Sequence, residues 1–159
     1  MGLYRPMQTQ PCRIGALCGR GVTYLAAGTH SFAVCGDFDE VVAFGSNTWG
    51  QLGLGHAIWQ ASPQVVPALC RIRVTRIACG FAHTVVLTAE DEVLAFGRND
   101  AGQLGLGDEQ DRSEPVRVET VCGAGVRQLD CGASHTVFLT NADEVLAVGC
   151  NATGRVRGR

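Results

Sequence analysis

A segment of the chain returns almost unchanged 52 residues further on. Residues 43–55 and residues 95–107 share the pattern Ala-Phe-Gly-x-Asn-x-x-Gly-Gln-Leu-Gly-Leu-Gly. A third, decayed copy begins at Ala147 and breaks down after Gly154. A fixed period of this length is the signature of a repeat architecture. We therefore expect residues that recur in every copy to hold the scaffold together and not to carry chemistry.

The same register runs through most of the chain. It relates three sets of residues: Gly28, Gly80 and Gly132; Gly45, Gly97 and Gly149; and Pro11, Pro63 and Pro115. It divides the sequence into an N-terminal tail (1–9), a trailing half-repeat (10–27), two whole repeats (28–79 and 80–131), a leading half-repeat (132–155) and a C-terminal tail (156–159). The chain thus holds about three units.

Each unit predicts four short strands. Residues 83–88 and 92–97 are rich in β-branched and apolar side chains, and the acidic stretch between them suits a tight hairpin turn. A Gly/Asn/Asp cluster at 99–107 predicts a loop with several positive φ angles. Residues 115–118 and 126–129 then alternate apolar and polar side chains. Four strands per unit of this length are typical of a propeller blade, so we expect an all-β fold of about three blades.

These motifs resemble the repeats of the regulator of chromosome condensation family. The match lies in Gly80-x-x-His83-Thr84, in the hairpin 92–97, and in the loop Asn99-x-x-Gly102-Gln103-Leu104-Gly105-x-Gly107. The resemblance implies a β-propeller, which in this family has seven blades. It also implies relatives among exchange factors for a small nuclear GTPase, ciliary proteins and repeat domains of ubiquitin ligases. Residues 44–53 look most like the ciliary group, which includes the retinitis pigmentosa GTPase regulator.

Three units are too few to close a ring, because propellers need about four to eight blades. The first interpretation is a fragment or truncated form of a larger propeller protein. The second is a head-to-tail homodimer. Because the N-terminal outer strands and the C-terminal inner strands together amount to one blade, two chains would then make a six-bladed ring.

Charge and hydropathy exclude several classes of partner. The net charge is −2, all 13 basic residues are arginine, and they form no run beyond the short cluster at 155–159. Direct nucleic-acid binding is therefore not expected. No apolar run approaches the ~20 residues of a membrane span, and residues 1–6 lack the apolar core of a signal peptide. We expect a protein of the cytoplasm, the nucleus or both.

The histidines do not point to catalysis. His83 and His135 occupy equivalent positions, and the 52-residue register places Ser31 there in the first copy. Because the position tolerates serine, we expect its side chain to hydrogen-bond to backbone groups inside its own blade. No catalytic residue is predicted from the sequence, and no cofactor.

The cysteines and acidic pairs also have simple interpretations. Cys18 and Cys70 share one repeat phase, Cys79 and Cys131 share another, and all are expected to be small, buried, reduced thiols. The spacing of closely set cysteine pairs in structural zinc sites is missing, so no metal site is predicted. The Asp91-Glu92 pair is expected to be solvated in its hairpin turn.

Function is expected where the copies disagree. Trp49 aligns with Ala101 and Thr153, and the apolar segment 56–62 aligns with the charged segment 108–114. Trp is over-represented among interface hot spots, and loops on a rigid scaffold carry recognition. We predict a protein-docking surface made by Trp49, Ile58 and Trp59, with Arg98, Asp100 and Arg112 beside it. The alternative is that Trp59 only covers the edge of its own blade.

Three functions remain on the sequence alone. The favoured one is a non-enzymatic protein-interaction module. The first alternative is a guanine nucleotide exchange factor or other regulator of a small GTPase, which the family resemblance permits although no long insertion separates the strands. The second alternative is a chromatin-associated propeller.

Overall fold

The structure is a computed structural model that describes residues 9–35 and 40–151. It contains eleven short strands and two single-turn 3₁₀ helices in the described residues. In chain order these are η1 (Gly15–Leu17), β1 (Val22–Ala27), β2 (His30–Cys35), β3 (Glu40–Gly45), β4 (Gln60–Val65), η2 (Pro67–Leu69), β5 (Val74–Cys79), β6 (His83–Thr88), β7 (Val93–Gly97), β8 (Arg112–Arg117), β9 (Val126–Cys131), β10 (His135–Thr140) and β11 (Val145–Gly149). No helix among them is long and apolar enough to cross a membrane.

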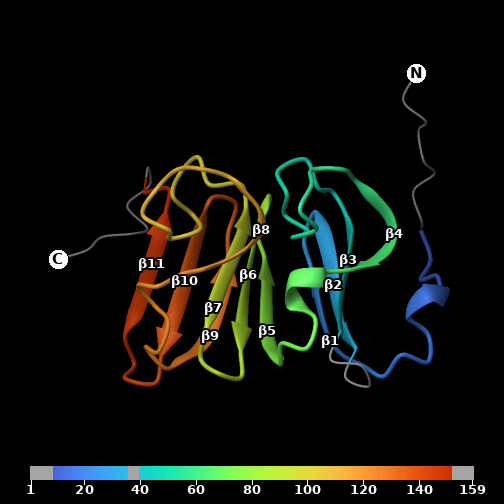
Figure 1. The fold of residues 1–159 in the computed structure, drawn as a ribbon, viewed down its shortest axis with the longest axis horizontal. Helices are drawn as coiled ribbons and strands as arrows, with labels where there is room; N and C mark the ends of the chain where they lie inside the picture. The colour runs from blue at the N-terminus through green and yellow to red at the C-terminus, as the bar shows by residue number, and fades with distance from the viewer. Residues whose placement is uncertain (1–8, 36–39, 152–159) are drawn as a thin grey trace.

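The strands form three antiparallel sheets that stand side by side as blades (Figure 1). Blade 1 is β1-β2-β3-β4, blade 2 is β5-β6-β7-β8, and blade 3 contains β9, β10 and β11 in the described residues. The prediction of an all-β propeller with an incomplete ring is confirmed. The blades are offset from the sequence units, because the unit 28–79 supplies β2 to β4 of one blade and β5 of the next.

Apolar side chains from adjacent blades meet in two cores. The first core joins Val41 and Phe32 of blade 1 to Ile77 and Phe96 of blade 2. The second repeats this arrangement between blades 2 and 3. Blade 2 therefore has apolar neighbours on both faces, and every residue of β6 and β7 is buried. This explains why β6 is a continuous apolar and threonine run without strict alternation.

A buried histidine in one blade bonds a threonine in the next. His30 Nε2 lies 2.8 Å from Thr84 Oγ1, and His83 Nε2 lies 3.0 Å from Thr136 Oγ1. The equivalent of His83 is thus His30, and the prediction that Ser31 takes this position is wrong. The prediction of backbone bonding within one blade is also wrong, since the partner is a hydroxyl of the next blade.

Two compensating one-residue changes explain the misplaced register. The backbone N–H of Gly28 donates to the carbonyl of His30, whereas that of Gly80 donates to the carbonyl of His83, one residue further along. His30 then pairs with Gly45 across β2 and β3, as His83 pairs with Gly97 across β6 and β7. Compared with blade 2, blade 1 has one residue fewer between Gly28 and its histidine and one residue more between that histidine and Gly45. The two changes cancel, so the 52-residue spacing holds before and after the histidine.

Asp91 links blade 2 to blade 3. It lies in the β6–β7 hairpin with a φ of 58°, and its carboxylate accepts hydrogen bonds from the backbone N–H groups of Gly125 and Val126, at 2.8 and 3.1 Å. The expected hairpin turn is present. The expectation of a merely solvated carboxylate is wrong for Asp91, because it caps the start of β9.

The cysteines are more exposed than expected. Cys18 and Cys70 are exposed, and Cys79 and Cys131 are partly buried. The prediction of buried thiols is therefore wrong for the first pair. Burial raises the pKa of Cys79 and of Cys131 to about 12, which keeps both thiols protonated and unreactive at neutral pH.

Candidate protein-docking surface

Two long loops at one end of the sheets are built on the same pattern. They are the β3–β4 loop (46–59) and the β7–β8 loop (98–111), each anchored by one fully buried asparagine. Asn47 accepts a hydrogen bond from the N–H of Leu52 at 2.9 Å and donates to the carbonyls of His56 and Ile58. The side chain therefore fastens both ends of the loop, and the residues between them are presented in a defined conformation.

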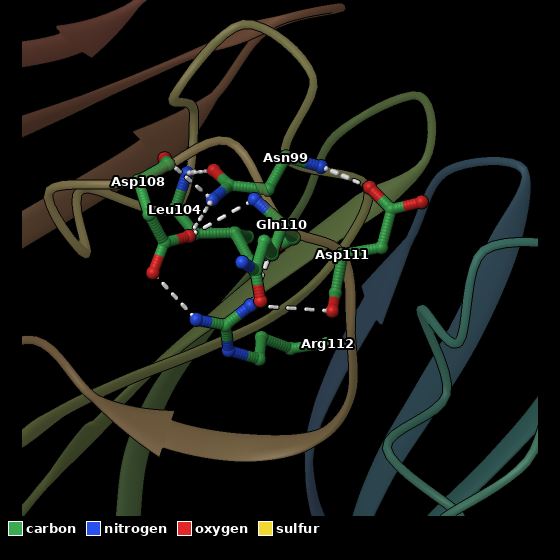
Figure 2. Close-up of polar contacts among 6 residues, drawn as sticks. All are labelled: Asn99, Leu104, Asp108, Gln110, Asp111 and Arg112. Atoms are coloured by element: carbon green, nitrogen blue, oxygen red, sulfur yellow. Dashed lines mark hydrogen bonds and ion pairs between the residues drawn. The ribbon is translucent and has the colours of Figure 1, made fainter.

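The second loop repeats this anchor with Asn99, as Figure 2 shows. Asn99 accepts from the N–H of Leu104 at 2.9 Å and donates to the carbonyl of Asp108 at 2.8 Å. The Asp108 carboxylate also accepts from the N–H of Gln110 at 2.9 Å. In the first loop, Nδ1 of His56 takes the place of this carboxylate and accepts from the N–H of Ile58 at 3.2 Å.

Arg112 makes its hydrogen bonds within the β7–β8 loop and the residues next to it. Its guanidinium donates to the Asp108 carboxylate at 2.6 Å and to the carbonyl of Gln110 at 2.7 Å (Figure 2). The backbone N–H of Gln110 and the Arg112 ion pair both favour the charged form and hold the pKa of Asp108 below its usual value. Arg112 thus closes the 108–112 turn by contacts within its own loop.

Arg98 of blade 2 contacts Trp49 of blade 1 and Asp100 of its own loop. The Arg98 guanidinium carbon lies 4.9 Å from the centre of the Trp49 ring, within the range of a cation–π contact. The same guanidinium forms an ion pair with Asp100. Burial opposes ionisation of Asp100, but hydrogen bonds from Arg98 and Gln103 outweigh it and lower the pKa of the carboxyl. We call these three residues the tip cluster.

The β3–β4 loop of blade 1 rests on β8 of blade 2. The N–H of Gly55 donates to the carbonyl of Ser113 at 3.0 Å. Gly50 approaches the same residue so closely that a Cβ atom there would lie 2.5 Å from the Ser113 Cα. A small cleft beside this contact is lined by Thr48, Trp49, Gly50, Ala57, Asp111 and Ser113. The tip cluster therefore stands at a junction of two blades, held from both sides.

The remaining predicted residues are on the same loop as Trp49. Ile58 and Trp59 are exposed by 66% and 52%, and Trp49 by 39%. The structure brings Trp49, Arg98 and Asp100 together and places Ile58 and Trp59 at the far end of the β3–β4 loop. Their role in binding stays a prediction.

Phe81 is an exposed residue that the sequence analysis does not include in the predicted surface. It lies in the β5–β6 connection, is 58% exposed, and stands at the same end of the sheets because β6 begins opposite the end of β7. Its backbone is tied to both neighbouring blades, through the Thr29 hydroxyl and through the carbonyl of Gly132. Comparison of the copies would have found it, since Thr29 and Ala133 stand at the corresponding place in the other two blades.

The fold and these anchored loops define the class of the protein: a β-propeller repeat protein whose variable loop tips are presented by a constant scaffold. The sequence profile of the Regulator of chromosome condensation (RCC1) repeat matches residues 39–87 and 90–139, and a second profile of the same repeat matches 74–103 and 126–155. The chain belongs to the RCC1 repeat family.

Relatives with this repeat are much longer. The chain is 37% identical to the human probable E3 ubiquitin-protein ligase HERC3 over 98% of its own length and 15% of that protein. It is 37% identical to the dog X-linked retinitis pigmentosa GTPase regulator over 84% of its length and 14% of that protein. The structure of Prp20p from Saccharomyces cerevisiae superposes with a TM-score of 0.71 at 21% identity, covering 80% of this chain and 33% of that one. The chain therefore spans between a seventh and a third of these proteins.

Proposed function

We propose that the chain is a non-enzymatic protein-interaction module that docks a protein partner on one end of its blades. The docking surface, which we call the tip surface, consists of Trp49, Ile58, Trp59, Phe81, Arg98, Asp100 and Arg112. The observation that carries the proposal is the exposed Trp49 ring, stacked on Arg98 and held by the Asn47 anchor. In the equivalent loop of blade 2 the same position is Ala101, so the scaffold does not need the ring.

The chemistry of the tip cluster suits a mixed apolar and charged partner surface. The second face of the Trp49 ring offers apolar area at low cost in conformational entropy, because Arg98 already limits its rotation. The ion pair leaves Asp100 half exposed, with a side-chain exposure of 51%. A partner with an aromatic or aliphatic anchor and a nearby basic group matches this arrangement.

The first alternative is regulation of a small GTPase. Its support is the relationship to a protein named as a GTPase regulator at 37% identity. The second alternative, association with chromatin, has less support because the net charge is −2 and the described surface carries paired arginines. For either alternative we place the protein in the cytoplasm, the nucleus or both.

The proposal is tested with purified small GTPases as probes. Each GTPase is loaded with a fluorescent guanine nucleotide, and its binding to residues 1–159 and its rate of nucleotide release are measured. Saturable binding that Trp49→Ala weakens at least ten-fold supports the tip surface. Accelerated release, lost in the same variant, supports the exchange-factor alternative. Binding that is unchanged in Trp49→Ala and in Phe81→Ala contradicts the proposed surface.

A matched control comes from the equivalent loop. Ala101 in blade 2 stands where Trp49 stands in blade 1, and Ala101→Ser changes that loop without adding or removing an aromatic ring. Wild-type affinity in Ala101→Ser and weakened affinity in Trp49→Ala assign the effect to the ring. A loss of folding in Trp49→Ala, seen by circular dichroism, would instead assign the ring to the blade junction.

A further inference from the structure

Three exposed arginines follow one another in blade 2, at the end of the sheets opposite to the tip surface. They are Arg71 and Arg73, in the turn between η2 and β5, and Arg76 in β5. β5 begins opposite the end of β6, whereas the tip loops lie where β6 begins. In Figure 1 the turn before β5 lies at the lower end of the blades and the long loops lie at the upper end. We call the three residues the arginine patch.

The fold places the three arginines within reach of one ligand. A register shift at Thr75 sets Arg76 opposite Leu87. Arg73 lies opposite Ala89, whose N–H donates to its carbonyl at 2.8 Å. Leu87 and Ala89 are alternate residues, so Arg73 and Arg76 share one face of the sheet, with Cα atoms about 7 Å apart. The third arginine precedes Arg73 by two residues, so its Cα atom also lies within about 7 Å of that of Arg73.

The arginine patch forms no ion pair with any residue that the structure describes. Arg76 donates to the carbonyl of the adjacent Thr75 at 3.0 Å. Five other arginines of the described surface each pair with a carboxylate: Arg20, Arg98, Arg112, Arg117 and Arg127. Glu90, which follows Ala89 in the β6–β7 hairpin, is exposed. The three arginines and Glu90 together have a net charge of +2, so this end of blade 2 is positive.

The other two blades have neutral residues at these positions. Arg71 has a φ of 64°, in the left-handed region, where Gly19 and Gly123 of the other copies have φ angles of 77° and 73°. Gly21 and Gly125 align with Arg73, and Tyr24 and Gln128 align with Arg76. A residue with a Cβ atom adopts a left-handed conformation only at a cost in free energy, which glycine avoids. The backbone therefore favours glycine at position 71, and strain of this kind is concentrated at functional sites.

We propose that the arginine patch is a second docking surface, which binds an acidic segment of a protein partner. The planar guanidinium group presents paired N–H donors that match the two oxygens of a carboxylate. In an extended segment, alternate side chains lie about 7 Å apart, which is also the spacing of the arginine positions. A segment with Asp or Glu at every second residue is therefore complementary to the patch in both charge and spacing.

A nucleic acid matches the arginine patch less well than an acidic protein segment does. Only three arginines would contact its phosphates, and the chain as a whole has a net charge of −2, which repels a long polyanion.

The probe is a fluorescent peptide with three glutamates separated by single serines, and its binding to residues 1–159 is measured by fluorescence anisotropy. We expect saturable binding that weakens as ionic strength rises from about 0.01 M to about 0.15 M, because the Debye length shortens from about 30 Å to about 8 Å. Arg73→Gln and Arg76→Gln should each raise the dissociation constant about two- to five-fold. No saturation below about 1 mM, or equal binding of a peptide with glutamine in place of glutamate, overturns the proposal.

A matched control is Arg127→Gln. Arg127 is exposed at the same end of the sheets but is paired with Asp143, so its removal should change the dissociation constant of the peptide by less than about two-fold. A loss as large as that of Arg73→Gln would mean that any positive charge at this end binds the peptide, and would overturn the assignment to the arginine patch.

Substitutions of Arg71 separate a binding role from a structural one. Arg71→Gly removes the charge and relieves the strained φ, so the melting temperature should rise by about 2–4 °C. The dissociation constant of the peptide should rise about two- to five-fold in the same variant. Arg71→Ala removes the charge and retains the strain, so it should weaken binding without raising the melting temperature. A lower melting temperature in Arg71→Gly would assign Arg71 to the fold and overturn the proposal.

A short single-stranded DNA of the same charge as the peptide is the competing probe. Tighter binding of the DNA than of the peptide, weakened by the same substitutions, would overturn the choice of a carboxylate ligand. Trp49→Ala should leave binding of the peptide unchanged, because the tip surface lies at the opposite end of the sheets. Failure of either docking surface therefore leaves the other intact.

Discussion

The imidazole Nε2 of His83 lies 3.0 Å from the hydroxyl oxygen of Thr136 in the neighbouring blade. That hydroxyl already donates to the carbonyl of Gln103 at 2.8 Å, so the imidazole must be the donor. Nε2 of His83 therefore carries a proton. Burial, which lowers the pKa of His83 to about 4, keeps the ring neutral at pH 7, and Nδ1 has no partner among the described residues. The same arrangement joins His30, Thr84 and Gln51 one blade earlier. These hydrogen bonds join the second strands of adjacent blades, β2 to β6 and β6 to β10.

The first prediction concerns pH. Burial, together with the charge of the neighbouring His83, lowers the pKa of His30 from 6.5 to about 4, and burial with the neighbouring His135 does the same for His83. Between about pH 6.5 and 4 the unfolded state binds more protons than the folded state. The free energy of unfolding therefore falls as pH is lowered through this window, by at most about 3 kcal/mol per histidine.

Urea unfolding at several pH values measures this dependence. His83→Gln keeps a side-chain donor but does not titrate, so the stability of this variant should fall less steeply between pH 6.5 and 4. If the free energy of unfolding has the same slope against pH in wild type and in His83→Gln, His83 is protonated to the same extent in the folded and unfolded states.

The second prediction concerns the threonine of the same contact. Thr136 is fully buried, and Thr136→Val removes the acceptor of His83 and the donor to Gln103. Leaving buried polar groups without partners is expected to lower the free energy of unfolding by about 1–3 kcal/mol. Thr136→Ser retains the hydroxyl and should lose about 1 kcal/mol for the missing methyl group. Chemical denaturation compares the two, and equal losses would argue that the hydroxyl is not needed.

The third prediction concerns His56, whose Nδ1 performs in blade 1 what the Asp108 carboxylate performs in blade 2. His56→Asp should therefore be tolerated within about 0.5 kcal/mol, whereas His56→Ala should cost about 1 kcal/mol because the N–H of Ile58 loses its acceptor. Thermal unfolding measures both. An aspartate variant as unstable as the alanine variant would mean that the two loops are not built alike.

The fourth prediction uses two glycines at the same repeat position. Gly50 and Gly102 have φ angles of +77° and +70°, so alanine at either site is strained by about 1 kcal/mol. At Gly102 a Cβ atom meets nothing within 4 Å in the described structure, but at Gly50 it lies 2.5 Å from the Ser113 Cα. Gly50→Ala should therefore lose about 1–3 kcal/mol more than Gly102→Ala. Equal melting temperatures would show that the β3–β4 loop does not rest on blade 2.

The candidate surface was only partly predictable. Differences between the copies select Trp49, Ile58 and Trp59 as candidates, and the same comparison at the Gly80-x-x-His83 segment adds Phe81. The stacking of Arg98 on Trp49 was not visible in the sequence, since the two residues belong to different blades and are 49 positions apart. Arg112 was selected for its charge, but three neighbouring acceptors within its own loop engage it.

The period, the hairpins, the Asn-x-x-Gly-Gln-Leu-Gly loop and the family of the blades could all be derived from the amino-acid sequence. These are local properties, because strand alternation, turn chemistry and loop anchors act between residues close in the chain. The contacts between blades needed the three-dimensional structure: His30 and not Ser31 joins the histidine contacts, Asp91 caps the first strand of the next blade, and Trp49 contacts Arg98. Each of these contacts joins residues of different blades. Packing of whole sheets decides them, and a period read along the chain does not.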